Sequence, residues 1–87
     1  MSTTSQDPAG LPEHDVLLDE RGRLCPLPII ALARAFAQDP PPGGVLLLTD
    51  DPAAAVDVPA WSSLRGKQVA WSAPYAEGAT AFLVTPA

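Results

Sequence analysis

The segment Asp39–Gly44, with the sequence DPPPGG, constrains the fold of this chain more than any other. It cannot continue a helix, because proline lacks a backbone donor and the residue before a proline leaves the helical region. Before this segment, apolar residues recur at helical spacing, namely Ile29, Leu32, Ala33 and Phe36. After it, Val45–Thr49 is a continuous apolar run. The sequence therefore predicts a helix over residues 26–38, a break, and then a central strand.

The rest of the chain predicts three further strands and a second helix. A short apolar run at residues 15–18 predicts the first strand. Segments 68–72 and 80–85, joined by a loop over 73–79, predict the last two strands. The resulting order is β-α-β-α-β-β. We therefore expect an α/β (α+β) two-layer sandwich, in which two helices cover one face of a four-stranded mixed sheet.

The second helix is expected to begin at Asp50-Asp51-Pro52, where either aspartate can cap it and Pro52 takes the first helical position. Pro59 interrupts this helix, because an interior proline removes a hydrogen bond and clashes with the preceding turn. We expect either a kink there or a short first turn followed by a main helix over Pro59–Arg65. A magnesium site at the two aspartates is the alternative, but adjacent acids before a proline favour the cap.

Composition indicates one small domain and disfavours several kinds of partner. Residues 1–14 are polar and lack periodicity, so we expect a disordered tail followed by a single domain over residues 15–87. The net charge is -5, so nucleic acid is not an expected direct partner. The apolar runs are too short to span a bilayer and no secretory signal is recognisable, so we expect a cytoplasmic protein. No metal site is expected, because His14 and Cys25 are the only soft ligands.

The single cysteine of the chain, Cys25, stands directly before the first predicted helix. A lone thiol cannot form an intramolecular disulfide, so a chemical role would be that of nucleophile, redox sensor or sulfur carrier. With Cys25 as the N-cap and Pro26 as the first helical residue, the helix N-terminus would favour the thiolate by about 0.3–1 kcal/mol. The alternative is a structural cysteine that packs as a small apolar residue.

Charged residues just ahead of the cysteine would shift its ionisation in both directions. Arg21 and Arg23 would favour the thiolate, whereas Asp19 and Glu20 would offset them. We count Arg23 among the supporting residues, where it acts either as a thiolate stabiliser or as a solvated loop charge. The sign of this balance stays open at the level of the sequence.

Residues 18–28, LDERGRLCPLP, resemble the signature LDxRGxxCPxP of the TusA/SirA-like sulfur-carrier family. Residues 50–53, DDPA, and 57–61, DVPAW, resemble the second block of that family. The resemblance covers about residues 15–85 and implies the sandwich described above. It also implies that one reactive cysteine accepts a sulfane sulfur as a persulfide and passes it on in a sulfur relay. By position, this sulfur-carrying, catalytic residue is Cys25.

The resemblance implies supporting roles for the residues around the cysteine. Pro26 and Pro28 would fix the helix start that presents the thiol. Asp19, Arg21 and Gly22 would shape the approaching loop, and we expect Asp19 and Arg21 to pair with each other.

The second block differs from some members of the family. Those members carry a second cysteine after the aromatic residue, whereas here Ser62 follows Trp61. An internal relay between two thiols is therefore not expected. Asp51 and Pro59 match by position as scaffold of the second helix rather than as chemistry.

The resemblance implies protein partners and leaves the pathway open. A sulfur-donor protein, such as a cysteine desulfurase or a rhodanese-like protein, would load Cys25, and an acceptor protein would take the sulfur. No cofactor is expected besides the covalent persulfide sulfur, and we expect a monomer without contact to nucleic acid or membrane. tRNA thiolation, molybdenum-cofactor supply, oxidation of reduced sulfur compounds and selenium handling are all compatible pathways.

Two rival functions are compatible with the same sequence. The first is a non-catalytic interaction or regulatory domain in which Cys25 serves packing. The second is a thiol redox sensor in which Cys25 is oxidised to a sulfenic acid and forms mixed disulfides.

Overall fold

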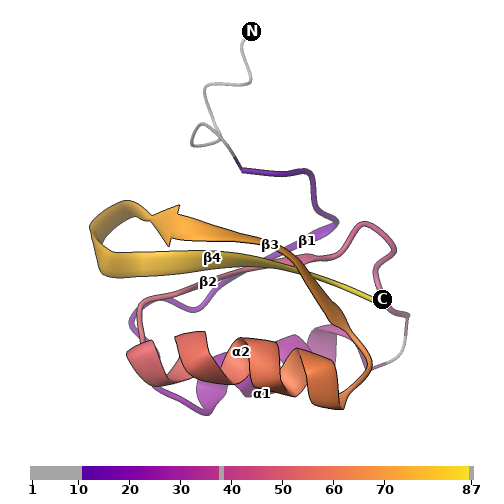
Figure 1. Cartoon of the computed structure of the whole chain (residues 1–87), viewed down its shortest axis with the longest axis horizontal. Helices are drawn as coiled ribbons and strands as arrows, with labels where there is room; N and C mark the ends of the chain where they lie inside the picture. Colours follow the sequence, from indigo (N-terminus) through magenta and orange to yellow (C-terminus); the bar gives the residue numbers. More distant parts are fainter. Residues whose placement is uncertain (1–10, 38, 87) are drawn as a thin grey trace, which may run out of the picture.

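The structure is a computed structural model that describes residues 11–37 and 39–86. Its elements follow in the order β1 (Val16–Asp19), α1 (Leu27–Ala35), β2 (Val45–Thr49), α2 (Pro52–Leu64), β3 (Gln68–Tyr75), the 3-10 turn η2 (Ala76–Gly78) and β4 (Ala79–Thr85). Figure 1 shows both helices side by side on one face of the sheet. The predicted β-α-β-α-β-β order and the two-layer sandwich are confirmed.

The four strands form one mixed sheet in the order β1-β2-β4-β3. β1 pairs in parallel with β2, whereas β4 runs antiparallel to both β2 and β3. All five residues of β2 are buried, which confirms the central position predicted for this apolar run. Because β1 and β2 are parallel, their carboxyl ends, Asp19 and Thr49, lie at the same edge of the sheet. The loops that follow these two strands therefore meet.

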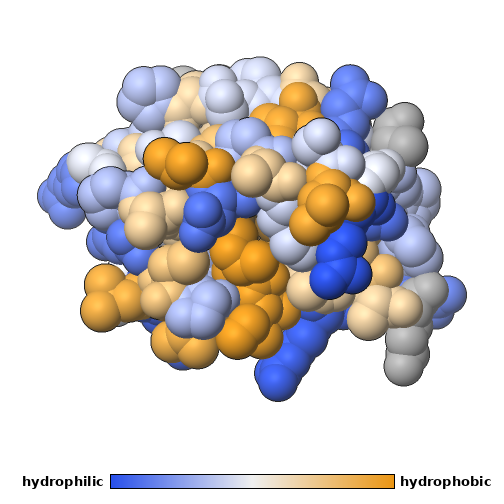
Figure 2. Space-filling view, turned by 60° about the horizontal axis from the view of Figure 1, so that its bottom comes forward, coloured by the Kyte–Doolittle hydropathy of each residue, from blue (hydrophilic) through white to orange (hydrophobic). Residues whose placement is uncertain are grey.

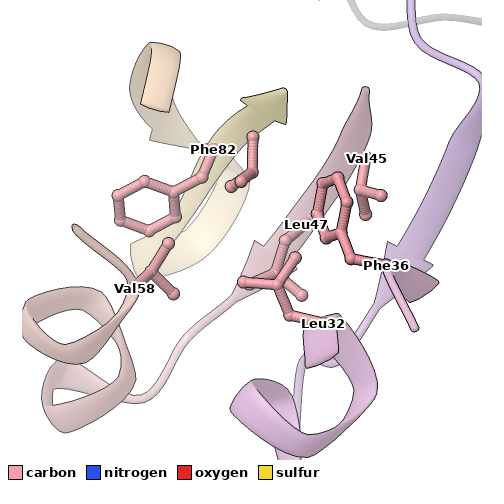
Figure 3. Packing of buried hydrophobic residues seen from close by; sticks show 7 residues of the cluster. Leu32, Phe36, Val45, Leu47, Val58 and Phe82 are labelled. Atoms are coloured by element: carbon pink, nitrogen blue, oxygen red, sulfur yellow. The ribbon is translucent and has the colours of Figure 1, made fainter. Parts of the chain in front are cut away.

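The main core fills the space between the helices and the sheet (Figure 3). α1 buries Pro28, Leu32 and Phe36, spaced four residues apart along one face. Leu32 and Phe36 pack with side chains from α2 and from the inner strands, namely Val45, Leu47, Val58, Phe82 and Val84. At Gly44, which has φ +91, the chain enters β2, and its backbone passes close to that of Val84 on β4.

The opposite face of the sheet carries a second apolar cluster, formed by Leu46, Leu48, Ala81 and Leu83, against which Leu11, Trp71 and Tyr75 pack. Leu11 belongs to the segment 1–14 for which we predicted disorder. Residues 1–10 of that segment lie outside the described residues, so the prediction for the tail stays a prediction.

The expectation of a short first turn followed by a separate main helix from Pro59 is wrong, because α2 is one continuous helix from Pro52 to Leu64. Ala54, Val58 and Ser62 are buried on both sides of the proline and anchor one face of the helix. Pro59 itself is exposed. Tertiary packing therefore outweighs the local cost of an interior proline.

Two further boundaries differ from the prediction. The first helix ends at Ala35, with Phe36 as its C-cap, rather than at residue 38. β3 continues to Tyr75 instead of ending at residue 72, although it contains Pro74. β3 is an edge strand, where a proline can be accommodated because one side of the strand needs no partner. The predicted loop over 73–79 is thus reduced to the turn Ala76–Gly78.

Candidate functional site

Cys25 lies half-buried in the loop between β1 and α1, immediately before the helix. The expectation that it caps α1 is wrong. The N-cap is Pro26, whose carbonyl oxygen accepts the first helical hydrogen bond from the N–H of Ile30 at 2.9 Å. Pro28 lies buried in the first turn. The thiol is therefore one residue further from the helix than the sequence suggested.

Asp51 holds the backbone of Cys25 in place. One oxygen of its carboxylate accepts a hydrogen bond from the Cys25 N–H at 2.6 Å. The other oxygen accepts from the N–H of Ala53 at 3.0 Å, which confirms Asp51 as the cap of α2. The sequence left the cap open between Asp50 and Asp51 and missed the bond to Cys25. The parallel pairing of β1 and β2 is the signal that could have joined the two segments.

Asp50 and Gly22 make a second bond between the same two loops. The N–H of Gly22 donates to the Asp50 carboxylate at 3.0 Å. Gly22 has φ +85, in the left-handed region that glycine adopts without strain. The N–H of Glu20 donates to the carbonyl oxygen of Leu48 at 2.9 Å and fixes the start of the loop. The loop that carries the thiol is thus fixed at several points.

Asp19 and Arg21 form a bidentate ion pair at the beginning of this loop. The Arg21 Nε and Nη2 atoms lie 2.8 and 2.7 Å from the two Asp19 carboxylate oxygens. The guanidinium group also lies over the ring of Tyr75, 5.3 Å from its centre. The hydrogen bonds from Arg21 hold the pKa of Asp19 below its ordinary value. This pair orders the loop and leaves Arg21 engaged away from the thiol.

Asp57 is the residue that contacts the thiol directly. The Cys25 sulfur donates a hydrogen bond to the Asp57 carboxylate across a distance of 3.1 Å. This bond raises the pKa of the Cys25 thiol, with smaller contributions from burial and from the charges of Asp57 and Asp51. The sequence left the sign of this balance open, and the contact with Asp57 disfavours the thiolate in the isolated protein. No spacing rule within the sequence indicated this contact.

Arg23 lies exposed on the loop and faces Glu20. Its side chain is 60% exposed, and its Nε lies 3.7 Å from a carboxylate oxygen of Glu20. A pair of this kind at the surface contributes little to stability. This position is typical of a solvated loop charge, which is one of the two expectations for Arg23.

An open apolar hollow adjoins the sulfur between α1 and α2. It has a volume of about 300 Å³ and is lined by Cys25, Pro26, Ile29, Asp57, Ala60, Trp61 and Leu64. The ring of Trp61, which lines the hollow, lies 6.1 Å from that of Phe36 and packs against the main core. Figure 2 shows apolar side chains gathered on this helical face. Leu64, which lines the hollow, is exposed, and so are Leu24 and Leu27 next to Cys25 and Pro26 in the sequence.

Other kinds of site find no support in residues 11–37 and 39–86. No group of three or more His, Cys, Asp and Glu side chains in these ranges could hold a metal ion. No helix within the described part of the chain is long and apolar enough to cross a membrane.

Comparison with known proteins identifies the family of the chain. A family model described as Sulfurtransferase TusA matches residues 16–85, which is most of the chain. The match spans Cys25 together with both aspartates that contact it. A comparison with individually curated proteins found no match. The chain belongs to the TusA sulfurtransferase family.

Proposed function

We propose that this protein is a sulfur carrier that accepts a sulfane sulfur as a persulfide on Cys25 and delivers it to an acceptor protein. Membership of the family supports a sulfurtransferase role in general. The observation that carries the finer proposal is the placement of Cys25. Its thiol is accessible at the rim of an open apolar hollow, while its backbone is held by Asp51.

The loading step conserves atoms and electrons without an external oxidant. The Cys25 sulfur attacks the terminal sulfur of a donor persulfide, R–S–SH, and a new S–S bond forms on Cys25. The S–S bond of the donor breaks, and its inner sulfur leaves as the thiol R–SH with the proton from Cys25. The rate of such a step depends on the thiolate fraction, the leaving group and access to the sulfur. In the delivery step the Cys25 persulfide is the donor, and the acceptor protein takes its terminal sulfur by the same exchange.

Protein partners are needed at both steps. A raised pKa leaves the isolated thiol largely protonated at neutral pH, so it is a weak nucleophile on its own. The apolar residues around the sulfur offer a surface that a docking protein can desolvate. The donor is a cysteine desulfurase or a rhodanese-like protein, and the carrier works as a monomer in the cytoplasm. It needs no cofactor besides the sulfur that it carries.

The supporting residues act on the geometry of the loop rather than on the sulfur. Asp19 and Arg21 order the beginning of the loop, and Gly22 allows the turn that Asp50 holds. Pro26 and Pro28 form the start of α1 behind the thiol. Arg23 remains accessible for contact with a partner. tRNA thiolation is one pathway that such a carrier can serve.

Sulfur transfer from a purified cysteine desulfurase tests this proposal. Radiolabelled cysteine is supplied as the sulfur source, and the carrier is isolated without reductant. We expect label on the wild-type protein that dithiothreitol releases, and no label on Cys25→Ser. A parallel reaction with hydrogen peroxide measures oxidation of the same thiol.

The two rival functions predict different outcomes of this experiment. A redox sensor would react rapidly with peroxide and take up sulfur slowly. An interaction domain would take up no sulfur from any donor, and its thiol would resist alkylation in the folded state. Either result would contradict the sulfur-carrier proposal.

A further inference from the structure

The environment of the Cys25 sulfur is anionic. Asp57, on α2, lies 3.1 Å from the sulfur, and Asp51, at the cap of α2, binds the N–H of the same residue. A carboxylate that accepts a hydrogen bond from the neutral thiol loses that bond, and gains a like charge, when the thiol ionises. The same negative charge raises the free energy of any anion that approaches the sulfur.

Basic side chains do not compensate this charge within the described residues. In the loop before α1, Arg21 is paired with Asp19, and Arg23 points towards Glu20. On α1 the basic residue, Arg34, lies in the last turn, at the opposite end of the helix from Cys25.

The two basic residues that follow α2 form no ion pair with Asp57 in the described part of the chain. Arg65 is the C-cap of α2, at the other end of that helix from Asp51. The ammonium group of Lys67 lies over the ring of Phe36, 5.2 Å from its centre. The carboxylate of Asp57 thus reaches the thiol without a basic partner among the described side chains.

We propose that Asp57 is a specificity-determining residue that keeps the unloaded thiol neutral, disfavours anionic sulfur donors and favours a donor that brings a basic side chain to it. This inference rests on the proposed sulfur-carrier function. It names the class of donor: a protein-bound persulfide beside a basic residue, rather than a small anion such as thiosulfate. When that basic residue binds Asp57, the hydrogen bond to the sulfur is released and the thiolate becomes available.

Two thiol reagents of opposite charge test the local field without any sulfur donor. A methanethiosulfonate reagent with a trimethylammonium group is compared with one that carries a sulfonate group, and each rate is normalised to that of 2-mercaptoethanol. We expect wild-type Cys25 to prefer the cationic reagent by about tenfold, as Coulomb's law in water gives for unit charges about 6 Å apart. Asp57→Asn loses most of this preference, and Asp57→Glu retains it.

The pH profile of alkylation by neutral iodoacetamide provides the second readout. Asp57→Asn is expected to lower the pKa of the thiol, because it removes the charge that opposes ionisation. At neutral pH this raises the thiolate fraction and with it the rate of alkylation, although the lower intrinsic nucleophilicity of the thiolate offsets part of the gain. The matched control is Asp39→Asn, which removes the same charge beyond the far end of α1. A nine-residue helix spans about 13 Å, so this control should leave both readouts unchanged.

The outcomes separate this inference from the function on which it rests. A wild-type protein without charge preference, or an Asp57→Asn variant with the wild-type ratio and pH profile, would overturn the role of Asp57. The wild-type ratio requires no variant, so the test stands even if Asp57→Asn fails to fold. Failure of sulfur loading by every donor, with the charge preference intact, would instead contradict the carrier function.

Discussion

The backbone N–H of Cys25 donates a 2.6 Å hydrogen bond to the carboxylate of Asp51, a residue 26 positions further along the chain. The same carboxylate caps α2 through the N–H of Ala53. One side chain therefore determines both where α2 begins and where the thiol-bearing loop is held. The stability of the domain and the geometry of the site depend on a shared contact.

Replacement of Asp51 by alanine removes both of these bonds. We expect the free energy of unfolding to fall by about 2–5 kcal/mol, because the cap contributes about 0.5–2 kcal/mol and a hydrogen bond to a charged group about 1.5–3 kcal/mol. Urea denaturation measures the loss. Asp51→Asn keeps a side chain that caps helices well, so its loss should be smaller. Equal midpoints for the wild type and Asp51→Ala would show that the contact does not hold the loop.

Truncation of Phe36 tests the packing of α1 on the sheet. Phe36 is 7% exposed and lies in the main core, so Phe36→Ala should lower the free energy of unfolding by about 3–5 kcal/mol. Ile30→Ala on the outer face of the same helix should cost less than about 0.5 kcal/mol, because Ile30 is 41% exposed. Both are measured by chemical denaturation. Similar losses for the two variants would contradict the assigned face of α1.

Substitution of two glycines with positive φ allows the cost of backbone strain to be compared with the cost of a steric clash. Gly44 has φ +91, and a Cβ there would lie 2.9 Å from the Val84 carbonyl oxygen, whereas Gly66 has φ +71 and open space around it. Gly66→Ala should cost about 1 kcal/mol from strain alone, and Gly44→Ala should cost about 2 kcal/mol or more. Thermal melts of the two variants compare these costs. A larger loss for Gly66→Ala would contradict the close packing of residue 44 against β4.

The ion pair of Asp19 and Arg21 should make a contribution to stability that depends on pH. Arg21 lowers the pKa of Asp19, so Arg21→Ala should raise that pKa towards its ordinary value. Since the folded-state pKa is depressed, the pair contributes stability above the unfolded-state pKa, and this contribution is lost as pH falls through the folded-state pKa. An NMR titration of the Asp19 carboxyl carbon measures the shift. Identical titration curves in the two proteins would mean that the pair does not form in solution.

Local patterns were sufficient to predict most of the fold. The apolar run Val45–Thr49 predicted a central strand with the observed bounds, because burial on both faces of a sheet requires apolar residues at every position. Pro59 shows where local rules fail. Its effect on α2 is decided by the burial of Val58 and Ser62 against the sheet, which a local rule for proline does not include.

The site was only partly predictable for a related reason. Cys25 and the loop residues lie in one continuous segment, so their proximity follows from the sequence. The contact between Cys25 and Asp57 joins residues 32 positions apart and arises from the packing of α1 beside α2. It also opposes the effect expected from the helix N-terminus. The direction in which the pKa of the thiol is shifted could therefore be found only from the three-dimensional arrangement.

The central claim is that Cys25 carries the transferred sulfur, and peptide mass spectrometry tests it most directly. The reduced protein is incubated with a cysteine desulfurase and cysteine, alkylated without reductant, digested and mapped. The account predicts a gain of one sulfur atom on the Cys25 peptide, removed by dithiothreitol and missing in Cys25→Ser. A Cys25 peptide of unchanged mass, from a folded protein whose thiol is closed to alkylation, would contradict it and assign the cysteine to packing.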